Sequence, residues 1–265
     1  MDFTGKVALI TGGGGGIGRA TALCFALRGA KVMVVDADAD AGQASVDIIA
    51  QRGATAAFVK ADVTKSASVK DYVEKTVAAY GRIDAFFNNA GIEGKVVPTQ
   101  DYDEEIFDQV IAVNLKGVFL GMRHVLPVML KQGSGAIVNT ASVAGLFGSP
   151  GMAAYVASKH GVLGLTKVAS TDVAGLGVRV NAVCPGPVET RMMRSLESQR
   201  NPNSPESVHA AYSAGIPTGR YALPEEIAGA VLYLCSDLSG NVTGTHIVID
   251  GGRSASGGVA PVKRI

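Results

Sequence analysis

The sequence predicts an α/β fold with a single domain, in which a doubly wound, seven-stranded parallel sheet carries helices on both faces. Short apolar runs alternate with longer helical patterns along the chain, and this alternation builds parallel sheets through right-handed crossovers. Polar residues follow the ends of several runs, where ligands bind in such sheets. The expected strands are 6–11, 31–36, 56–61, 83–88, 134–140, 178–183 and 246–250, and the expected helices are 16–29, 39–52, 66–80, 102–130, 153–175 and 224–236.

A glycine-rich turn separates the first strand from the first helix. The apolar run 6–11 is followed by five consecutive glycines, then Ile17 and Gly18. A lone glycine cluster is often a flexible linker, but a strand before it and a helix after it are the context of a dinucleotide-binding loop. Glycines let the backbone approach a pyrophosphate, and the helix N-terminus favours the anion. The residues expected to bind the cofactor here are Gly12, Gly15, Gly16, Ile17 and Gly18.

The second strand ends in an acidic residue, Asp36, eighteen residues after Gly18. A carboxylate at this place accepts hydrogen bonds from the adenosine ribose hydroxyls and repels the 2′-phosphate of NADP. Ala37 and the glycines at 13–15 provide no cation that would pair with that phosphate. The sequence therefore predicts NAD as the cofactor.

Tyr155 and Lys159 are four residues apart, and Ser142 precedes Tyr155 by thirteen residues. Residues i and i+4 share one helix face, so the ammonium of Lys159 is expected beside the phenol. A charge about 4 Å away lowers a tyrosine pKa of about 10 by up to about three units. Tyr155 is then expected to act as an acid and base near neutral pH. A Tyr-x-x-x-Lys pair alone is also common as solvated helix surface.

Several segments together resemble the short-chain dehydrogenase/reductase family over about residues 4–252. Thr11 to Gly18 resembles the cofactor loop of that family, and Asp62-Val63 resembles its adenine contact. The run 88–91, Asn-Asn-Ala-Gly, resembles the motif that steadies the central sheet and lines the cofactor. The run 185–190, Pro-Gly-Pro-Val-Glu-Thr, resembles the stretch that holds the nicotinamide amide.

The resemblance implies a Rossmann fold over residues 1–252 and an NAD-dependent oxidoreductase that interconverts a secondary alcohol and a ketone by hydride transfer. It implies that Tyr155 acts as acid and base, and that Lys159 lowers the pKa of this tyrosine and binds the ribose. It also implies that Ser142 donates a hydrogen bond to the reacting oxygen, and that Asn114 holds a water that relays protons to Lys159. The implied catalytic residues are Asn114, Ser142, Tyr155 and Lys159, and the further cofactor-binding residues are Asp62, Val63, Asn89, Ala90, Gly91, Tyr155, Lys159, Pro185, Gly186, Val188 and Thr190. It also implies a homotetramer.

Two segments depart from the compact rhythm of strands and helices. Residues 189–220, with one short helical pattern at 206–213, are expected to form a substrate lid. Met192, Met193 and Leu196 would give it an apolar wall. Residues 253–265 form a C-terminal tail that is either disordered or reaches a neighbouring subunit. Glu93 borders the expected pocket, either as an exposed loop charge or as a contact to a polar substrate.

Composition limits the partners. The 265 residues are 47% hydrophobic with a net charge of +1, which argues against nucleic-acid and membrane partners and leaves a small-molecule substrate. The chain start lacks a signal-peptide pattern, and no apolar run reaches membrane-span length, so a cytoplasmic location is expected. The cysteines and histidines have no ligand spacing, so no metal is expected.

Three alternatives to a simple alcohol dehydrogenase stay open. A 3-oxoacyl-carrier-protein reductase is the nearest, although Asp36 speaks against it because those enzymes commonly prefer NADPH. A lyase or epimerase of the extended relatives usually carries a larger C-terminal substrate domain. A non-catalytic NAD sensor would not require Ser142, Tyr155 and Lys159 together.

Overall fold

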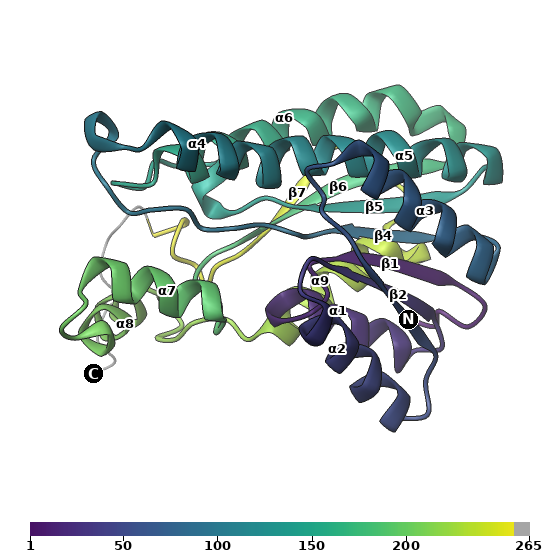
Figure 1. Ribbon diagram of the computed structural model, residues 1–265, viewed down its shortest axis with the longest axis horizontal. Helices are drawn as coiled ribbons and strands as arrows, with labels where there is room; N and C mark the ends of the chain where they lie inside the picture. Colours follow the sequence, from purple (N-terminus) through teal and green to yellow (C-terminus); the bar gives the residue numbers. More distant parts are fainter. Residues whose placement is uncertain (257–265) are drawn as a thin grey trace.

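The computed structural model describes residues 1–256, and a parallel sheet forms their centre (Figure 1). Its seven strands follow the order β3-β2-β1-β4-β5-β6-β7, so the direction of winding reverses between β1 and β4. All neighbouring strands pair in parallel, which places their carboxyl ends on one edge. The strands are β1 (Val7–Thr11), β2 (Lys31–Asp36), β3 (Ala56–Lys60), β4 (Ala85–Asn88), β5 (Gly135–Thr140), β6 (Val178–Pro185) and β7 (His246–Ile249).

Helices cover both faces of the sheet, as predicted. One core cluster joins the sheet to α3, α5 and α6, and a second joins it to α1, α2 and α9, which lie on opposite sides in Figure 1. The strands are buried on both faces, as parallel sheets require. The helices are α1 (Gly16–Ala26), α2 (Ala39–Gln51), α3 (Ser66–Tyr80), α4 (Glu104–Ile111), α5 (Gly117–Gln132), α6 (Ala153–Val173), α7 (Arg191–Arg200), α8 (Pro205–Ala214) and α9 (Pro224–Cys235).

Each predicted strand agrees with the structure within two residues at either end. The single helix expected at 102–130 is wrong in one respect, because a π-helical turn at Ala112–Lys116 divides it into α4 and α5. A π-turn inserts one extra residue into the helical ladder and is frequent at functional sites. Here it contains the fully buried Asn114.

The helical run Glu104–Gln132 also corrects the expectation that no segment reaches membrane-span length. Its length and mean hydropathy of 1.2 would allow it to cross a bilayer. In the fold, its buried residues, among them Val118, Met122 and Val125, pack into the core against the sheet. Core helices pass the same test of length and composition, so this run is weak support for a membrane span.

The segment expected as a lid leaves the sheet after β6 and returns to α9. Its ends lie side by side, since Glu189 N–H donates to the Ala222 carbonyl (2.9 Å) and Ala222 N–H donates to the Pro187 carbonyl (3.0 Å). It holds two helices, whereas the sequence predicted only one near α8. The unpredicted α7 is mostly polar. Thr190 precedes it as a normal N-cap, since its side chain accepts from Met193 N–H.

Candidate active site

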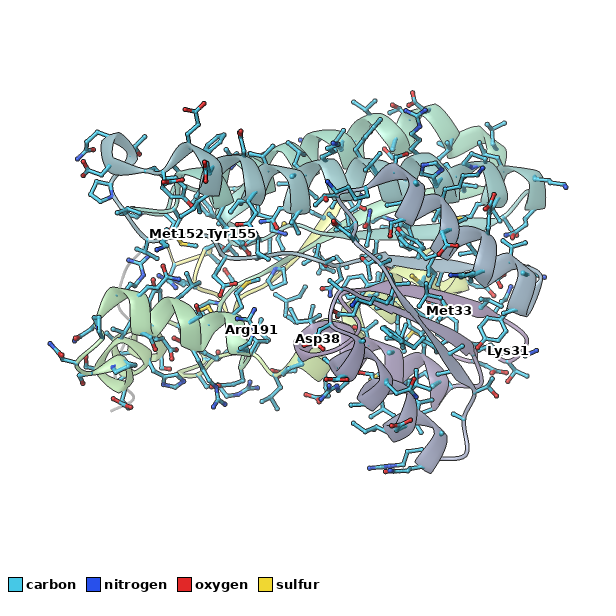
Figure 2. All side chains as sticks on the ribbon, viewed as in Figure 1. Lys31, Met33, Asp38, Met152, Tyr155 and Arg191 are labelled. Atoms are coloured by element: carbon cyan, nitrogen blue, oxygen red, sulfur yellow. The ribbon has the colours of Figure 1, made fainter. Side chains whose placement is uncertain are left out.

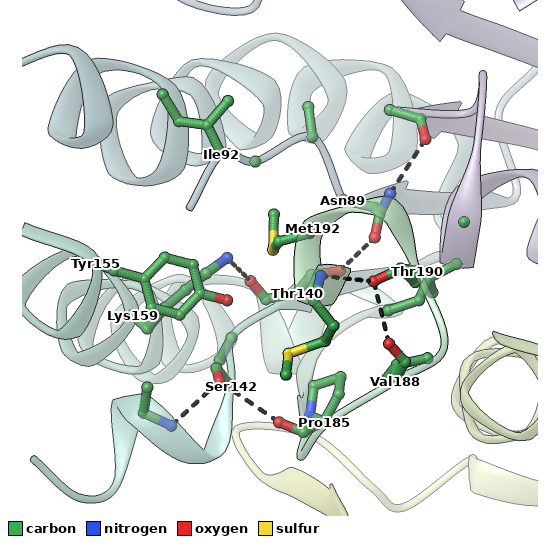
Figure 3. Close-up of a pocket in the computed structure, with 18 of the residues that line it drawn as sticks. Asn89, Ile92, Thr140, Ser142, Tyr155, Lys159, Pro185, Val188, Thr190 and Met192 are labelled. Carbon is green, nitrogen blue, oxygen red and sulfur yellow. Dashed lines mark hydrogen bonds between the residues drawn. The ribbon is translucent and has the colours of Figure 1, made fainter. Parts of the chain in front are cut away.

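A cavity of about 1150 Å³ opens at the carboxyl ends of the central strands, with α7 along one side. Figure 3 looks into it, with side chains from β5, α6 and the segment after β6 gathered around one space. Nearly all residues predicted to bind the cofactor or catalyse line this cavity: Gly12, Gly15, Gly16, Ile17, Asp36, Asp62, Val63, Asn89, Ala90, Gly91, Ser142, Tyr155, Lys159, Pro185, Gly186, Val188 and Thr190. Gly18 and Asn114 do not line the cavity. They instead support the segments that line it.

Gly18 serves the packing of the glycine loop. A Cβ atom at Gly18 would collide with the carbonyl of Gly12, so α1 can start this close to the turn only with glycine. Gly12 itself has φ of 64°, and a Cβ there would lie 3.0 Å from the Cα of Ala90. Of these two positions, Gly12 needs glycine for its backbone conformation, and both need it for close approach.

The Asp36 carboxylate is fixed against the glycine loop. Oδ2 accepts from Gly14 N–H (2.8 Å) and Oδ1 accepts from Asp38 N–H (3.0 Å). Gly14 also lines the cavity, although the sequence prediction did not include it. The signal was available only in three dimensions, because a Cβ at Gly14 would lie 2.8 Å from Asp36 Oδ2.

The asparagine pair after β4 has two separate tasks. Asn88 Nδ2 donates to the Val118 carbonyl (2.9 Å) and to Asn139 Oδ1 (3.2 Å), which ties the sheet to α5. Asn89 faces the cavity, and its amide donates to the Thr11 carbonyl (3.1 Å) while Thr140 Oγ1 donates to Asn89 Oδ1 (3.1 Å). Asn89 thereby links the ends of β1 and β5 beside the glycine loop (Figure 3).

Asn114 holds the backbone that follows Gly91. Its Oδ1 accepts from Ile92 N–H (2.8 Å), and its Nδ2 donates to the Ile92 carbonyl (2.9 Å) and to Ser158 Oγ (3.3 Å). The π-turn around Asn114 turns this side chain toward the segment after β4. Its direct partners are therefore backbone and Ser158, and the water relay implied by the family resemblance stays a prediction.

Three side chains converge at one end of the cavity. Lys159 Nζ donates to the Thr140 carbonyl (2.7 Å) and lies 5.5 Å from the centre of the Tyr155 ring. Ser142 Oγ accepts from Ala144 N–H (3.1 Å) and donates to the Pro185 carbonyl (3.4 Å). In Figure 3, the Tyr155 hydroxyl and the Ser142 side chain lie on the same side of the space.

Burial overrides the predicted effect of Lys159 on Tyr155. Desolvation raises the pKa of Tyr155 to about 12, against a lowering by its hydrogen bond with Ser142 and a further raising by the charge of Glu93. Desolvation also lowers the pKa of Lys159 to about 8. The expectation that Tyr155 has a pKa near neutrality is therefore wrong, because moving both groups out of water favours their neutral forms.

The lid supplies the wall opposite the sheet. Met192, Met193 and Leu196 of α7 line the cavity as predicted. Arg191, labelled in Figure 2 on α7, also lines it and pairs with Glu93 at 3.4 Å. Glu93 is only 8% exposed, so the interpretation of it as an exposed loop charge is wrong.

Further lining residues come from places that the sequence did not indicate. Phe147, Ser149 and Met152 lie on the loop between β5 and α6, and Tyr212 lies on α8. Arg253 and Ser254, which the sequence placed in the tail, also line the cavity. The tail was predicted over residues 253–265 as either disordered or reaching a neighbouring subunit; its residues 257–265 lie outside the described residues, and the reach to a neighbouring subunit stays a prediction.

No metal site adjoins these groups in residues 1–256, where no set of three or more His, Cys, Asp or Glu side chains is placed to hold an ion.

Comparison with known proteins adds an independent line. Residues 13–254 match the family model described as enoyl-(acyl carrier protein) reductase. Levodione reductase of Leifsonia aquatica is 43% identical, with 96% of both chains covered. Cyclohexanol dehydrogenase of an Acinetobacter species is also 43% identical, with 94% of this chain and 95% of the relative covered.

Solved structures agree. The crystal structure of levodione reductase matches with a TM-score of 0.94 at 43% identity, covering 96% of this chain and 99% of that chain. The structure of NAD⁺-bound xylitol dehydrogenase matches with a TM-score of 0.91 at 37% identity, covering 95% and 100%.

The chain belongs to the short-chain dehydrogenase/reductase family. The predicted family and the Rossmann-type doubly wound fold are thereby confirmed. Membership makes this short-chain dehydrogenase/reductase an oxidoreductase, and interconversion of secondary alcohols and ketones fits its relatives.

Proposed function

We propose that this short-chain dehydrogenase/reductase oxidises a secondary alcohol to a ketone with NAD and catalyses the reverse reduction. The observation that carries the proposal is the convergence of Ser142, Tyr155 and Lys159 in a cavity that also contains Asp36. A hydroxyl, a phenol and an amine around one space suit proton transfer to and from a carbinol oxygen. The carboxylate suits the ribose of the cofactor.

The cavity residues fit NAD. The glycine loop allows close approach of a pyrophosphate, and Asp36 is held by two backbone amides with its position fixed. The lining residues beside Asp36 are Ala37, Asp38 and Ala41, and none would pair with a 2′-phosphate. The segment Pro185 to Thr190 would hold the nicotinamide end.

The reaction needs one hydride acceptor and one proton acceptor. The bound NAD would supply the acceptor for the hydride of the carbinol C–H bond. Tyr155 takes the O–H proton, so that the C–O single bond becomes a C=O double bond. Ser142 would donate a hydrogen bond to the reacting oxygen. Lys159 would stabilise the phenolate, and its bond to the Thr140 carbonyl holds the amine in place.

The pKa values of the two buried groups set the proton chemistry. Tyr155 with a pKa of about 12 is a proton donor at neutral pH, as ketone reduction requires. Alcohol oxidation requires the phenolate, and it is therefore expected to accelerate as pH rises toward 10.

A second candidate is reduction of a 3-oxoacyl thioester. It is favoured by a 3-oxoacyl-acyl-carrier-protein reductase of Thermotoga maritima, 44% identical over 95% of this chain. The position of Asp36 favours NAD and speaks against it. Acetoacetyl thioester reduction with NADPH that exceeds alcohol oxidation with NAD would establish this candidate instead.

The test is NADH formation from secondary alcohols, cyclic alcohols, sugar alcohols, steroids and hydroxy acids. Tyr155→Phe keeps the ring in place and removes the proton-transferring oxygen, so turnover should fall below a few per cent while NAD affinity changes less than about threefold. Retained activity in this variant would contradict the role of Tyr155. Absence of turnover in the parent protein, with NAD binding intact, would favour an NAD sensor.

We also propose that the protein forms homotetramers in the cytoplasm. An apolar groove of about 460 Å³ lies between α5 and α6 and is lined by Leu115, Phe119, Leu165 and Val168 among others. Phe119 is 43% and Val168 60% exposed. A second copy of the chain, seated across this groove, would cover these side chains.

A further inference from the structure

Beyond the catalytic groups, the cavity is bordered by α8 and by the segment after β7. Tyr212 lines it from α8, and Arg253 and Ser254 line it from that segment. None of them takes part in the proposed chemistry. This part of the cavity, formed by Tyr212, Arg253 and Ser254, is called the distal subsite below.

Arg253 is half-buried, and its guanidinium lies 5.0 Å from the centre of the Tyr212 ring. Within residues 1–256 its side chain makes no hydrogen bond and no ion pair. A guanidinium on an aromatic face keeps its N–H donors free for an oxyanion. Arg191, in contrast, pairs with Glu93, and Arg220 pairs with Glu226.

A second cation lies near the distal subsite, although it does not itself line the cavity. The Arg200 guanidinium lies 5.7 Å from the centre of the same Tyr212 ring. Its one side-chain hydrogen bond in the described residues is a long one of 3.5 Å to the Pro150 carbonyl. Two guanidinium groups around one tyrosine repel each other, and an anion bound between them would offset this repulsion.

Two carboxylates on neighbouring segments, those of Asp250 and Glu197, accept hydrogen bonds from other groups. Asp250 accepts from Gly252 N–H (2.9 Å) and Ser254 N–H (2.7 Å). Glu197 accepts from the Tyr221 hydroxyl (2.8 Å). Among residues 1–256, therefore, no carboxylate pairs with Arg253, and its guanidinium faces the cavity.

We infer that Arg253, stacked on Tyr212, binds an oxyanion of the substrate at a distance from the reacting carbon. The substrate class is then a secondary alcohol or ketone that also carries a carboxylate, sulfonate or phosphate group. This inference rests on the proposed function, because it assumes that the cavity holds the reacting alcohol. The apolar wall of Met192, Met193 and Leu196 would cover the carbon chain between the two ends.

The probes are a series of hydroxy acids from 3-hydroxybutanoate to 7-hydroxyoctanoate, each paired with its neutral methyl ester. The series varies the spacing between carbinol and carboxylate, and the esters keep the chain while removing the charge. The variants are Arg253→Ala, Arg253→Lys and, as the matched control, Arg194→Ala. Arg194 is an exposed lid arginine that does not line the cavity.

We expect at least one acid to exceed its ester by about tenfold or more in kcat/KM, since a hydrogen bond to a charged group is worth about 1.5–3 kcal/mol. Arg253→Ala should lower kcat/KM for that acid about 10- to 100-fold and change the ester less than about threefold. Arg253→Lys should retain part of the preference. The KM of the acid should rise with salt. Arg194→Ala should change neither substrate.

Equal use of acids and esters across the series, or an equal loss for both in Arg253→Ala, would overturn the distal subsite. Calorimetric binding of each acid and ester to the protein with NAD present gives a readout that needs no turnover. Selective acid binding without turnover of any alcohol would support the subsite and overturn the proposed function. Turnover of neutral alcohols without any preference for acids would support the proposed function and overturn the distal subsite. Substitution of sulfonate or phosphate analogues of the best length then identifies the preferred oxyanion.

Discussion

The ammonium group of Lys159 donates a 2.7 Å hydrogen bond to the carbonyl oxygen of Thr140, the last residue of β5. This bond fixes the amine below the Tyr155 ring and determines where the cation lies. Lys159 is 3% exposed, and one neutral carbonyl does not replace the water that a charged amine loses. The active site therefore holds a charge that the fold tolerates at a cost in stability.

Replacement of Lys159 should stabilise the fold while it abolishes activity. Burial lowers the pKa of Lys159 to about 8, against about 10.4 in the unfolded chain. Between these values the unfolded state binds more protons, so wild-type stability rises with pH in this window and the penalty is complete below about pH 8. At pH 7, the free energy of unfolding of Lys159→Met should exceed that of the wild type by up to about 3 kcal/mol.

Urea unfolding at pH 7 and pH 10 measures this difference. The advantage of Lys159→Met should shrink at pH 10, and the exposed control Lys167→Met should show no such trend. A wild-type protein more stable than Lys159→Met by more than about 1 kcal/mol at pH 7 would mean that the Thr140 bond outweighs desolvation.

Asp36→Asn should change the choice of cofactor. The variant removes the negative charge that would repel a 2′-phosphate and keeps one oxygen for the glycine loop. The ratio of kcat/KM with NAD to kcat/KM with NADP should fall about 10- to 100-fold. Asp40→Asn, on the first turn of α2 and outside the cavity, is the matched control. An unchanged ratio in Asp36→Asn would refute the assignment of Asp36.

Gln199→Ala should weaken substrate binding without affecting the cofactor. Gln199 Oε1 accepts from Val96 N–H (3.0 Å) and Nε2 donates to the Gly94 carbonyl (3.2 Å), so it joins α7 to the loop after β4. Each bond is worth about 1 kcal/mol, and their loss should raise substrate KM about 3- to 10-fold. Steady-state kinetics of Gln199→Ala give the KM for the substrate and the KM for the cofactor separately. The exposed neighbour Ser198→Ala is the matched control. A similar rise in both variants would count against a role for these bonds.

Val168→Asp should dissociate the proposed tetramer. Val168 lines the groove between α5 and α6, and a carboxylate there would be buried by a second copy without a partner. Light scattering after size exclusion should give a lower mass for Val168→Asp than for the wild type, with Lys167→Glu unchanged. A wild-type monomer would refute the proposed assembly.

The sequence predicted those parts of the fold that depend on patterns within a short stretch of the chain. The glycine loop, Asp36 and the Tyr155–Lys159 pair depend on spacing within one or two elements, and the structure brings them to one cavity. The strands were predictable because parallel strands are apolar along their whole length.

What could not be predicted depends on partners distant in sequence. The pKa of Tyr155 follows from burial, which no spacing reveals. Glu93 is buried and pairs with Arg191, almost a hundred residues later in the sequence. Helix α7 is mostly polar, so its pattern gave little signal. Arg253 lines the cavity beside Tyr212, which lies on α8 far earlier in the sequence.

The paired backbone at Glu189 and Ala222 has a consequence for how such enzymes diversify. The two ends of the lid are hydrogen-bonded to each other, so the residues between them form a closed loop. The entropic cost of closing a loop grows only slowly with its length, so insertions here cost little stability. Specificity for a new substrate can therefore evolve through changes in this segment alone, while the residues that bind the cofactor and transfer the proton stay the same.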